Sequence, residues 1–222
     1  MKAVSLKFSA PVCLVGGGAL TREMLDAALA IAPKLVAADG AADRLGDWDL
    51  KPDAIIGDMD SISDPDRWRA AGCAVVELDE QDSTDFGKCL YATEAPFYVA
   101  VGFTGRRVDH MLAVFSSMLA MPEKTVVLVG EEEVATLVPA ARPLTFSLAA
   151  GAVVSIYPLA PVRGTISNGL QWPIDGLEMQ AGRQIGTSNV AIRDQVSIGF
   201  DRPGALLMLE RRFLSPLIAA LT

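Results

Sequence analysis

As far as about residue 130, the chain alternates short apolar runs with stretches of helical periodicity. Short apolar runs bounded by Gly or Asp are typical of strands that are buried on both faces. This alternation predicts a mainly parallel sheet with helices on both faces, the α/β class. The predicted strands cover residues 12–15, 35–38, 54–56, 74–78, 97–101 and 125–129, and the predicted helices cover 21–31, 65–71, 83–93 and 109–120.

From about residue 143 onward, the pattern changes to β-rich segments separated by Gly, Pro and Asn. Such segments are typical of a small all-β sandwich or barrel. We expect an α/β domain over residues 1–140 and a β-sandwich domain over 141–222, with a final helical turn near Pro216. The predicted strands of the second domain are 144–148, 153–158, 164–167, 191–198 and 205–209.

The composition excludes several classes of protein. With 51% hydrophobic residues the chain can bury a large core, and no apolar run reaches the roughly 18 to 20 residues that span a bilayer. Three widely spaced cysteines (Cys13, Cys73 and Cys89) and one histidine favour neither a disulfide framework nor a zinc site, so we expect a cytoplasmic protein without a membrane partner.

The negative charge is concentrated in one part of the chain. The segment from Asp39 to Asp85 holds 14 of the 27 acidic residues and only four of the 19 basic ones, in a chain with a net charge of −8. This charge argues against nucleic acid as a partner, because nucleic acid is polyanionic.

Two carboxylates follow the apolar run AII in the sequence GDMDS. Asp58 and Asp60 are two residues apart, so on an extended segment they point the same way and can share a hard cation. In the later sequence DSTDFGK, Asp85 and Lys88 have the spacing of one helix face. The sequence therefore predicts a metal site with a third acid and a cation nearby.

Other polar or glycine-rich segments also come directly after predicted strands. They are Gly16–Gly18, Asp39 and the sequence GFTGRRVDH at 102–110, which contains Arg107 and His110. Ligands of open α/β sheets bind outside the carboxyl ends of the strands. A glycine turn and arginines at a helix start also suit anionic oxygen, so we expect a phosphate-binding site here.

These residues resemble the thiamine pyrophosphokinase (thiamine diphosphokinase) family across both predicted domains and in the same order along the chain. The segments that carry the resemblance are ADGAA at 38–42, PDAIIGDMDS at 52–61, DSTDFGK at 82–88, GFTGRRVDH at 102–110, GLQWP at 169–173 and TSN at 187–189. The resemblance implies transfer of the β,γ-diphosphoryl group of ATP to the hydroxyl of thiamine, giving thiamine diphosphate and AMP. It also implies Mg²⁺ as cofactor and a homodimer with sites between subunits.

The resemblance further implies roles for individual residues. The catalytic group would be Asp39, Asp58, Asp60, Asp85 and Lys88, with Asp58, Asp60 and Asp85 as metal ligands. The ATP-binding group would be Ser61, Gln81, Thr84, Arg107, Asp109 and His110. The thiamine-binding group would be Trp172, Ser188 and Asn189. The sequence does not choose the general base among the carboxylates.

Two other kinds of function fit part of the sequence. A metal-dependent transferase with another substrate, either a hydroxymethylpterin pyrophosphokinase or a nucleotide-sugar glycosyltransferase, would also use paired carboxylates on an α/β sheet. A non-catalytic thiamine- or nucleotide-binding protein is the third hypothesis, because Ala41, Arg106 and Val190 depart from the family pattern. Ligand binding without turnover would distinguish it from an enzyme.

Overall fold

The structure is a computed structural model that describes residues 6–80, 82–105, 107–140 and 142–222. The chain forms two compact units, Met1–Ser117 and Met118–Thr222. Strands β8 (Val126–Val129) and β9 (Glu133–Leu137) lie in the second unit, because β8 pairs with β9 and β9 pairs with the C-terminal strand β16 (Ala205–Glu210). The functional domain boundary at 140/141 stays a prediction.

The N-terminal unit is built on the predicted parallel sheet. Its strands lie in the order β7-β2-β3-β4-β5, and every neighbouring pair is parallel. The first four of these strands are buried except for Lys34 at the start of β3, as expected for the centre of an α/β sheet. Their bounds are β2 Val12–Val15, β3 Lys34–Ala38, β4 Ala54–Gly57, β5 Ala74–Glu77 and β7 Tyr98–Val101. A separate parallel pair joins β1 (Leu6–Lys7) to β6 (Thr93–Glu94).

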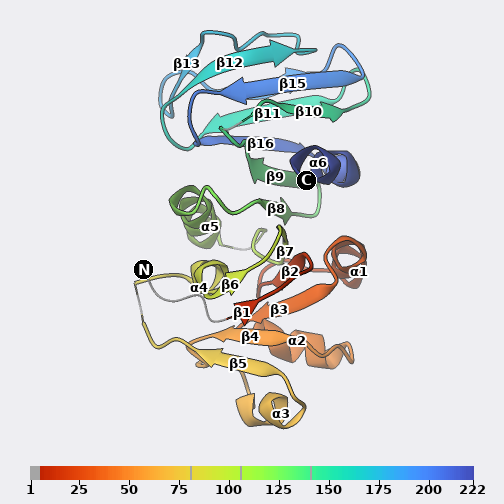
Figure 1. Cartoon of the computed structure of the whole chain (residues 1–222), viewed down its shortest axis with the longest axis vertical. Coiled ribbons are helices and arrows are strands. Elements are labelled where there is room, and N and C mark those ends of the chain that lie inside the picture. Colours follow the sequence, from red (N-terminus) through yellow and green to blue (C-terminus); the bar gives the residue numbers. More distant parts are fainter. Residues whose placement is uncertain (1–5, 81, 106, 141) are drawn as a thin grey trace. The chain divides into compact units, whose positions relative to one another are not determined.

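Helices lie on both sides of this sheet, as the alternating sequence predicts (Figure 1). Three of them begin at a side-chain cap: Thr21, Asp64 and Thr84 each accept a hydrogen bond from a backbone N–H of the first turn. The helices are α1 Arg22–Ile31, α2 Ala41–Asp47, α3 Pro65–Ala70, α4 Asp85–Ala92 and α5 Val108–Ala120. Helix α2 was not predicted, because its short sequence lacks a clear apolar period.

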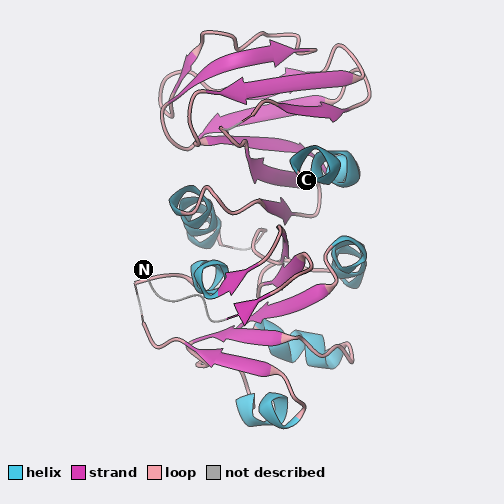
Figure 2. Ribbon diagram, viewed as in Figure 1, coloured by secondary structure: helices cyan, strands magenta, loops and turns pink. Residues whose placement is uncertain are grey.

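The C-terminal unit consists mostly of antiparallel strands (Figure 2). One sheet contains β8, β9, β16, β11 and β14 in that order, and a second has the order β10-β15-β12-β13. Buried residues alternate with exposed ones along β10 and with exposed or half-buried ones along β11, as they do in sheets with one face against a core. The remaining bounds are β10 Leu144–Ser147, β11 Val153–Pro158, β12 Val162–Asn168, β13 Glu178–Met179, β14 Gly186–Val190 and β15 Gln195–Phe200.

Two details of the C-terminal prediction are wrong. The expected strand over 191–198 is interrupted: β14 ends at Val190, Ala191 forms only an isolated bridge with Leu170, and β15 begins at Gln195. The run of apolar residues there is broken by Arg193 and Asp194, which lie in a bend. The expected final turn is a full helix, α6 (Leu214–Leu221), after a short 3₁₀ turn at Arg211–Phe213.

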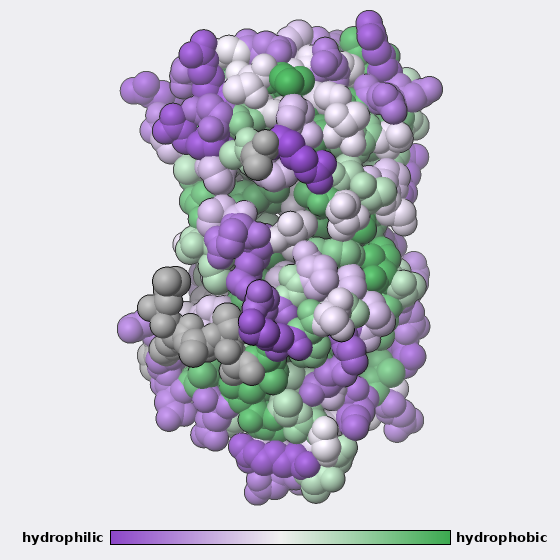
Figure 3. Space-filling model, viewed as in Figure 1, coloured by the Kyte–Doolittle hydropathy of each residue, from purple (hydrophilic) through white to green (hydrophobic). Residues whose placement is uncertain are grey.

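The surface is of mixed polarity. On the face seen in Figure 3, hydrophilic side chains cover much of both units and are interrupted by small hydrophobic groups. Within the described part of the chain, every helix is too short or too polar to cross a bilayer.

Candidate functional site

A cavity of about 630 Å³ lies in the N-terminal unit, where the parallel strands end. Its wall is formed by the loops that follow β2, β3, β4 and β7, together with the first turns of α4 and α5. This is the position at which open α/β sheets take up ligands. The lining residues are Gly16, Gly17, Gly18, Ala38, Asp39, Gly40, Ala41, Asp58, Ser61, Ser83, Thr84, Asp85, Phe86, Lys88, Gly102, Phe103, Thr104, Arg107, His110, Ala113 and Val114.

One side of the cavity is formed by backbone, because the loops after β2 and β7 touch there. The N–H of Gly18 donates to the carbonyl of Gly102 at 2.6 Å. A Cβ on Gly16 would lie 2.6 Å from the same carbonyl oxygen, and Gly102 has a φ of +73°. Side chains are excluded at both positions, so the glycines allow the two loops to approach this closely.

Asp39 lies directly after β3, and its side chain is buried with 2% exposure. Its Oδ2 accepts a hydrogen bond from the N–H of Ser61 at 3.2 Å. Among the described residues, its Oδ1 has no hydrogen-bond partner. A Cβ on Gly57 would lie 2.6 Å from the Asp39 Cβ, so the glycine of the sequence GDMDS makes room for this acid.

Burial and the nearby acids Asp85, Asp58 and Asp60 raise the pKa of Asp39 to about 6, although the Ser61 hydrogen bond opposes the shift. Ligand oxygens of Asp39, Asp58 and Asp60 lie within 4.8 Å of one another. Converging carboxylate oxygens, one of them buried and unpartnered, are hard ligands of the kind that Mg²⁺ prefers. The residues present therefore fit the expected metal.

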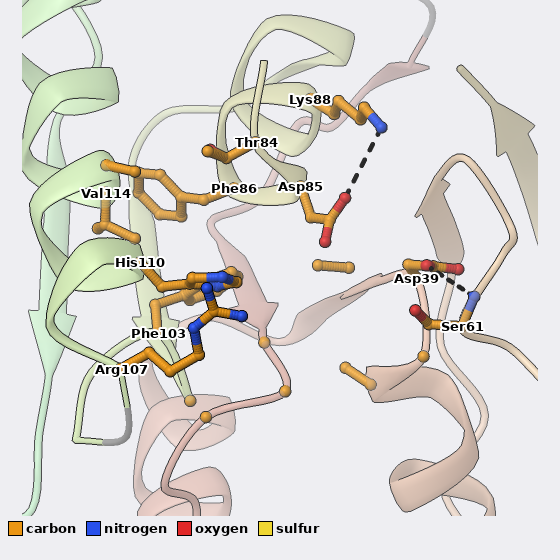
Figure 4. A pocket seen from close by; sticks show the side chains of 18 of the residues that line it. Asp39, Ser61, Thr84, Asp85, Phe86, Lys88, Phe103, Arg107, His110 and Val114 are labelled. Atoms are coloured by element: carbon orange, nitrogen blue, oxygen red, sulfur yellow. Dashed lines mark hydrogen bonds and ion pairs between the residues drawn. The ribbon is translucent and has the colours of Figure 1, made fainter. Parts of the chain in front are cut away.

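The predicted metal set of Asp58, Asp60 and Asp85 stays a prediction. The carboxylate of Asp85 lies close to Lys88, 3.8 Å from its Nζ (Figure 4). Asp39, which the resemblance places in the catalytic group, is the acid that converges with Asp58 and Asp60. The sequence does not show that Asp39 lies close to Asp58 and Asp60, because Asp39 follows β3 whereas the other two acids follow β4.

Lys88 is a buried cation beside this cluster, with 2% exposure. Its Nζ donates to Asp58 Oδ2 at 3.0 Å. Burial by itself lowers the pKa of Lys88, but the hydrogen bond and charge of Asp58, with Asp85, outweigh it and raise the pKa. Lys88 is therefore positively charged at neutral pH, one helical turn after Asp85 on α4.

Arg107 and His110 line the opposite side of the cavity, at the start of α5 (Figure 4). Arg107 is exposed and pairs with Asp109, its Nη2 lying 2.6 Å from Asp109 Oδ2. This hydrogen bond lowers the pKa of Asp109 to about 2. Asp109 is absent from the cavity wall and orients Arg107 instead.

The remaining residues of the predicted ATP group divide into two kinds. Ser61 and Thr84 line the cavity, whereas Gln81 lies outside the described residues. Two further features of the site were not predicted from the sequence. Phe86 and Phe103 form an edge-to-face pair in the cavity wall, with ring centroids 4.8 Å apart.

Glu80 is the second unexpected feature. Its carboxylate accepts hydrogen bonds from Ser83 Oγ at 2.6 Å, from the N–H of Asp82 at 3.1 Å and from the hydroxyl of Tyr91. These contacts fix the segment that leads into Thr84, the cap of α4. A single acid between predicted elements gives no sequence signal for such a role.

The three predicted thiamine-binding residues lie together in the C-terminal unit. Trp172 is 55% exposed, Asn189 is buried, and the two are joined by hydrogen bonds. Ser188 is exposed and has a φ of +59°, a left-handed conformation that is uncommon for a residue other than glycine. Backbone strain of this kind occurs often at binding sites.

The fold and the cavity together define an α/β protein with an acidic, glycine-walled site at the carboxyl ends of a parallel sheet, followed by an antiparallel β unit. Two family models match this chain. Residues 25–129 match the catalytic domain of thiamin pyrophosphokinase, and residues 144–204 match its vitamin B1 binding domain. The chain belongs to the thiamin pyrophosphokinase family, as its motifs predicted.

Relatives agree with this assignment. Thiamine pyrophosphokinase 1 of Arabidopsis thaliana is 29% identical over 167 residues, which are 68% of this chain and 62% of the plant protein. Thiamine pyrophosphokinase 1 of Oryza sativa subsp. japonica is 27% identical over 197 residues and covers 75% of each chain. The matched part of the present chain therefore spans less than two thirds of the Arabidopsis protein.

Solved structures share the fold. Yeast thiamin pyrophosphokinase superposes with a TM-score of 0.76 at 16% identity, covering 99% of this chain and 94% of the yeast chain. The protein from Candida albicans gives 0.75 at 16% identity, with 95% and 94% covered. That from Geobacillus thermodenitrificans gives 0.71 at 22% identity, with 90% and 96% covered.

Proposed function

We propose that this protein is a Mg²⁺-dependent thiamine diphosphokinase. It transfers the β,γ-diphosphoryl group of ATP to the hydroxyl of thiamine and releases AMP. The observation that carries the proposal is the cavity at the ends of parallel strands, which is lined by Asp39, Asp58, the buried Lys88 and a glycine backbone, with Asp60 converging on the two acids. Membership of the family supports the choice of substrates.

Asp39, Asp58 and Asp60 are the residues that would hold Mg²⁺. When bound, the ion neutralises the phosphate charge and polarises the reacting phosphoryl group. Without a cation these acids would repel ATP, because ATP is also negatively charged. Asp58 and Asp60 already repel the negative charge of Asp39 and raise its pKa when no ATP is bound. The three acids therefore favour ATP binding through a bound metal ion.

Lys88 and Arg107 supply the fixed positive charge for the phosphates. Lys88 is held by Asp58, and Arg107 is oriented by Asp109, so neither has to be ordered when ATP binds. His110 and Thr84 offer hydrogen-bonding groups in the same wall. Ser61 and Gln81 complete the proposed ATP group.

In the reaction, the hydroxyl oxygen of thiamine attacks the β-phosphorus of ATP. The new P–O bond forms as the bond from that phosphorus to the α,β-bridging oxygen breaks, and AMP carries that oxygen away. The hydroxyl proton passes to a base, for which we propose Asp85. Burial raises the pKa of Asp85 although Lys88 opposes it, and a raised pKa makes a carboxylate a better proton acceptor.

Thiamine binds at the cluster formed by Trp172, Ser188 and Asn189, where the indole of Trp172 is its direct contact. Its thiazolium ring carries a fixed positive charge, and an exposed indole attracts such a cation by about 1 to 2 kcal/mol once water is excluded. We further propose that the protein is a homodimer with its sites between subunits, as the family resemblance implies.

The test is AMP release from ATP and Mg²⁺ by the purified protein, with and without thiamine. We expect AMP to appear one-for-one with thiamine diphosphate, identified by mass. Thiamine binding without AMP would favour the non-catalytic protein. AMP formed only with a hydroxymethylpterin, or a sugar nucleotide consumed without AMP, would instead favour another transferase.

A further inference from the structure

The side chain of Asn189 is buried, with 3% exposure, and bonded to the segment that carries Trp172. Its Oδ1 accepts from the N–H of Trp172 at 3.1 Å and from the N–H of Val190 at 2.8 Å. Its Nδ2 donates to the carbonyl of Trp172 at 2.7 Å. One amide therefore satisfies both backbone polar groups of Trp172, and both lone pairs of its Oδ1 are used inside the protein.

The segment on either side of Trp172 is held separately. Before it, the N–H of Gln171 donates to the carbonyl of Val190 at 2.9 Å. After it, the N–H of Ile174 donates to Ser167 Oγ at 2.8 Å. The bonds from the Asn189 amide fill the gap between these two anchors, so the position of the Trp172 backbone depends on them.

The indole of Trp172 is mostly exposed, so packing alone does not fix its position. The residue next to Asn189 shows the opposite arrangement. Ser188, in its left-handed conformation, is exposed and donates its N–H to Ser155 Oγ at 3.0 Å. This local geometry leaves Ser188 available to a ligand while Asn189 is turned into the protein.

We propose that Asn189 is a positioning residue, whose amide holds the Trp172 backbone so that the indole is presented to the thiazolium ring. Asn189 acts on thiamine only through Trp172. The inference rests on the proposed function, because it takes Trp172 as the thiamine contact.

A double-mutant cycle tests this directly. We expect Asn189→Ala to raise the KM for thiamine about tenfold, the effect of losing buried hydrogen bonds at one place, with the KM for ATP unchanged. In a Trp172→Ala background, Asn189→Ala should add no further loss. Independent losses that add together would overturn the inference, because they would mean that Asn189 contacts thiamine itself. An equal rise in KM for both substrates would overturn it as well, since damage to the fold would explain such a change.

Asn189→Leu is the second variant, because its side chain has the same branching but no hydrogen bonds. It should reproduce the selective loss of thiamine affinity. Ser167→Ala is the matched control at the neighbouring anchor and should have the smaller effect.

Hydrogen exchange of the Trp172 N–H in the unsubstituted protein tests the same inference if these variants fail to fold. The chain has three tryptophans, so ¹⁵N-tryptophan labelling gives three backbone amide signals, and Trp172→Phe identifies one of them. We expect the Trp172 N–H to be protected from hydrogen exchange without thiamine. Exchange as fast as in a free peptide would overturn the inference while leaving the proposed function intact. An unchanged KM for thiamine in Trp172→Ala would instead refute the proposed thiamine contact.

Discussion

Replacing Asp39 by Asn should stabilise the metal-free protein at high pH while it removes activity. Asn keeps an oxygen for the Ser61 N–H and places an NH₂ group where Asp39 has an unpartnered oxygen. The backbone tolerates the change, because Asp39 has a φ of 41°, a conformation that Asn adopts readily.

The magnitude follows from the pKa of Asp39, which is raised from 3.8 to about 6. Each pKa unit corresponds to about 1.4 kcal/mol, so ionising this carboxyl in the folded protein costs up to about 3 kcal/mol. Between these two pH values the folded protein retains a proton that the unfolded chain releases. The free energy of unfolding therefore falls as the pH rises from about 4 to about 6. At pH 8 the variant should be more stable than the parent by up to about 3 kcal/mol, and at pH 4 the difference should nearly vanish.

The assay is urea unfolding in EDTA at pH 4 and pH 8. A Trp172→Phe background leaves Trp48 and Trp68 as fluorophores, both in the N-terminal unit, so the signal reports that unit alone. Asp109→Asn is the matched control, because the pKa of Asp109 is lowered and not raised. That variant should gain nothing at pH 8.

Equal stability of parent and Asp39→Asn at pH 8 would refute the reasoning. The same gain at both pH values would also contradict it, since that would trace the effect to backbone preference and not to charge. Added Mg²⁺ should stabilise the parent at pH 8 and have little effect on the variant.

Three other predictions follow from the proposed ATP and thiamine sites. Asp60→Asn should abolish turnover without lowering the melting temperature, because Asp60 is exposed and lies in the proposed metal cluster; a large loss of melting temperature would argue for a structural role. Lys88→Met should lower kcat by a factor of about 10² to 10³, as expected for loss of one preorganised charge at the reacting group, and steady-state kinetics at saturating ATP would detect it; an unchanged kcat would exclude Lys88 from the chemistry. If the sites lie between subunits, subunit exchange between inactive Asp58→Asn and Trp172→Ala, assayed at thiamine well below the raised KM of Trp172→Ala, should give more activity than the two proteins give unmixed, whereas no gain in a proven mixed dimer would argue against shared sites.

Local sequence patterns predict many of the strands and helix starts of the fold. Buried strands such as β2 and β4 are short apolar runs, and the caps Thr21 and Thr84 mark helix starts through their own hydroxyls. The predicted strand over 191–198 wrongly includes the charged bend before β15, because that bend lies within an apolar stretch, and β14 was not predicted. Helix α2 is too short to show a period.

The candidate site, like the fold, was predicted in part from the sequence. The sequence by itself determined which chemical groups are available at the site. Acids, glycines and arginines that directly follow parallel strands all lie at the carboxyl edge of the sheet, where ligands bind. Only the tertiary structure decided which of them meet. Asp39 converges with Asp58 and Asp60 because β3 and β4 are neighbours, and Asn189 bonds to Trp172 because its strand runs beside that loop. Contacts between residues distant in the sequence depend on strand order and side-chain direction, and neither is encoded in any one segment.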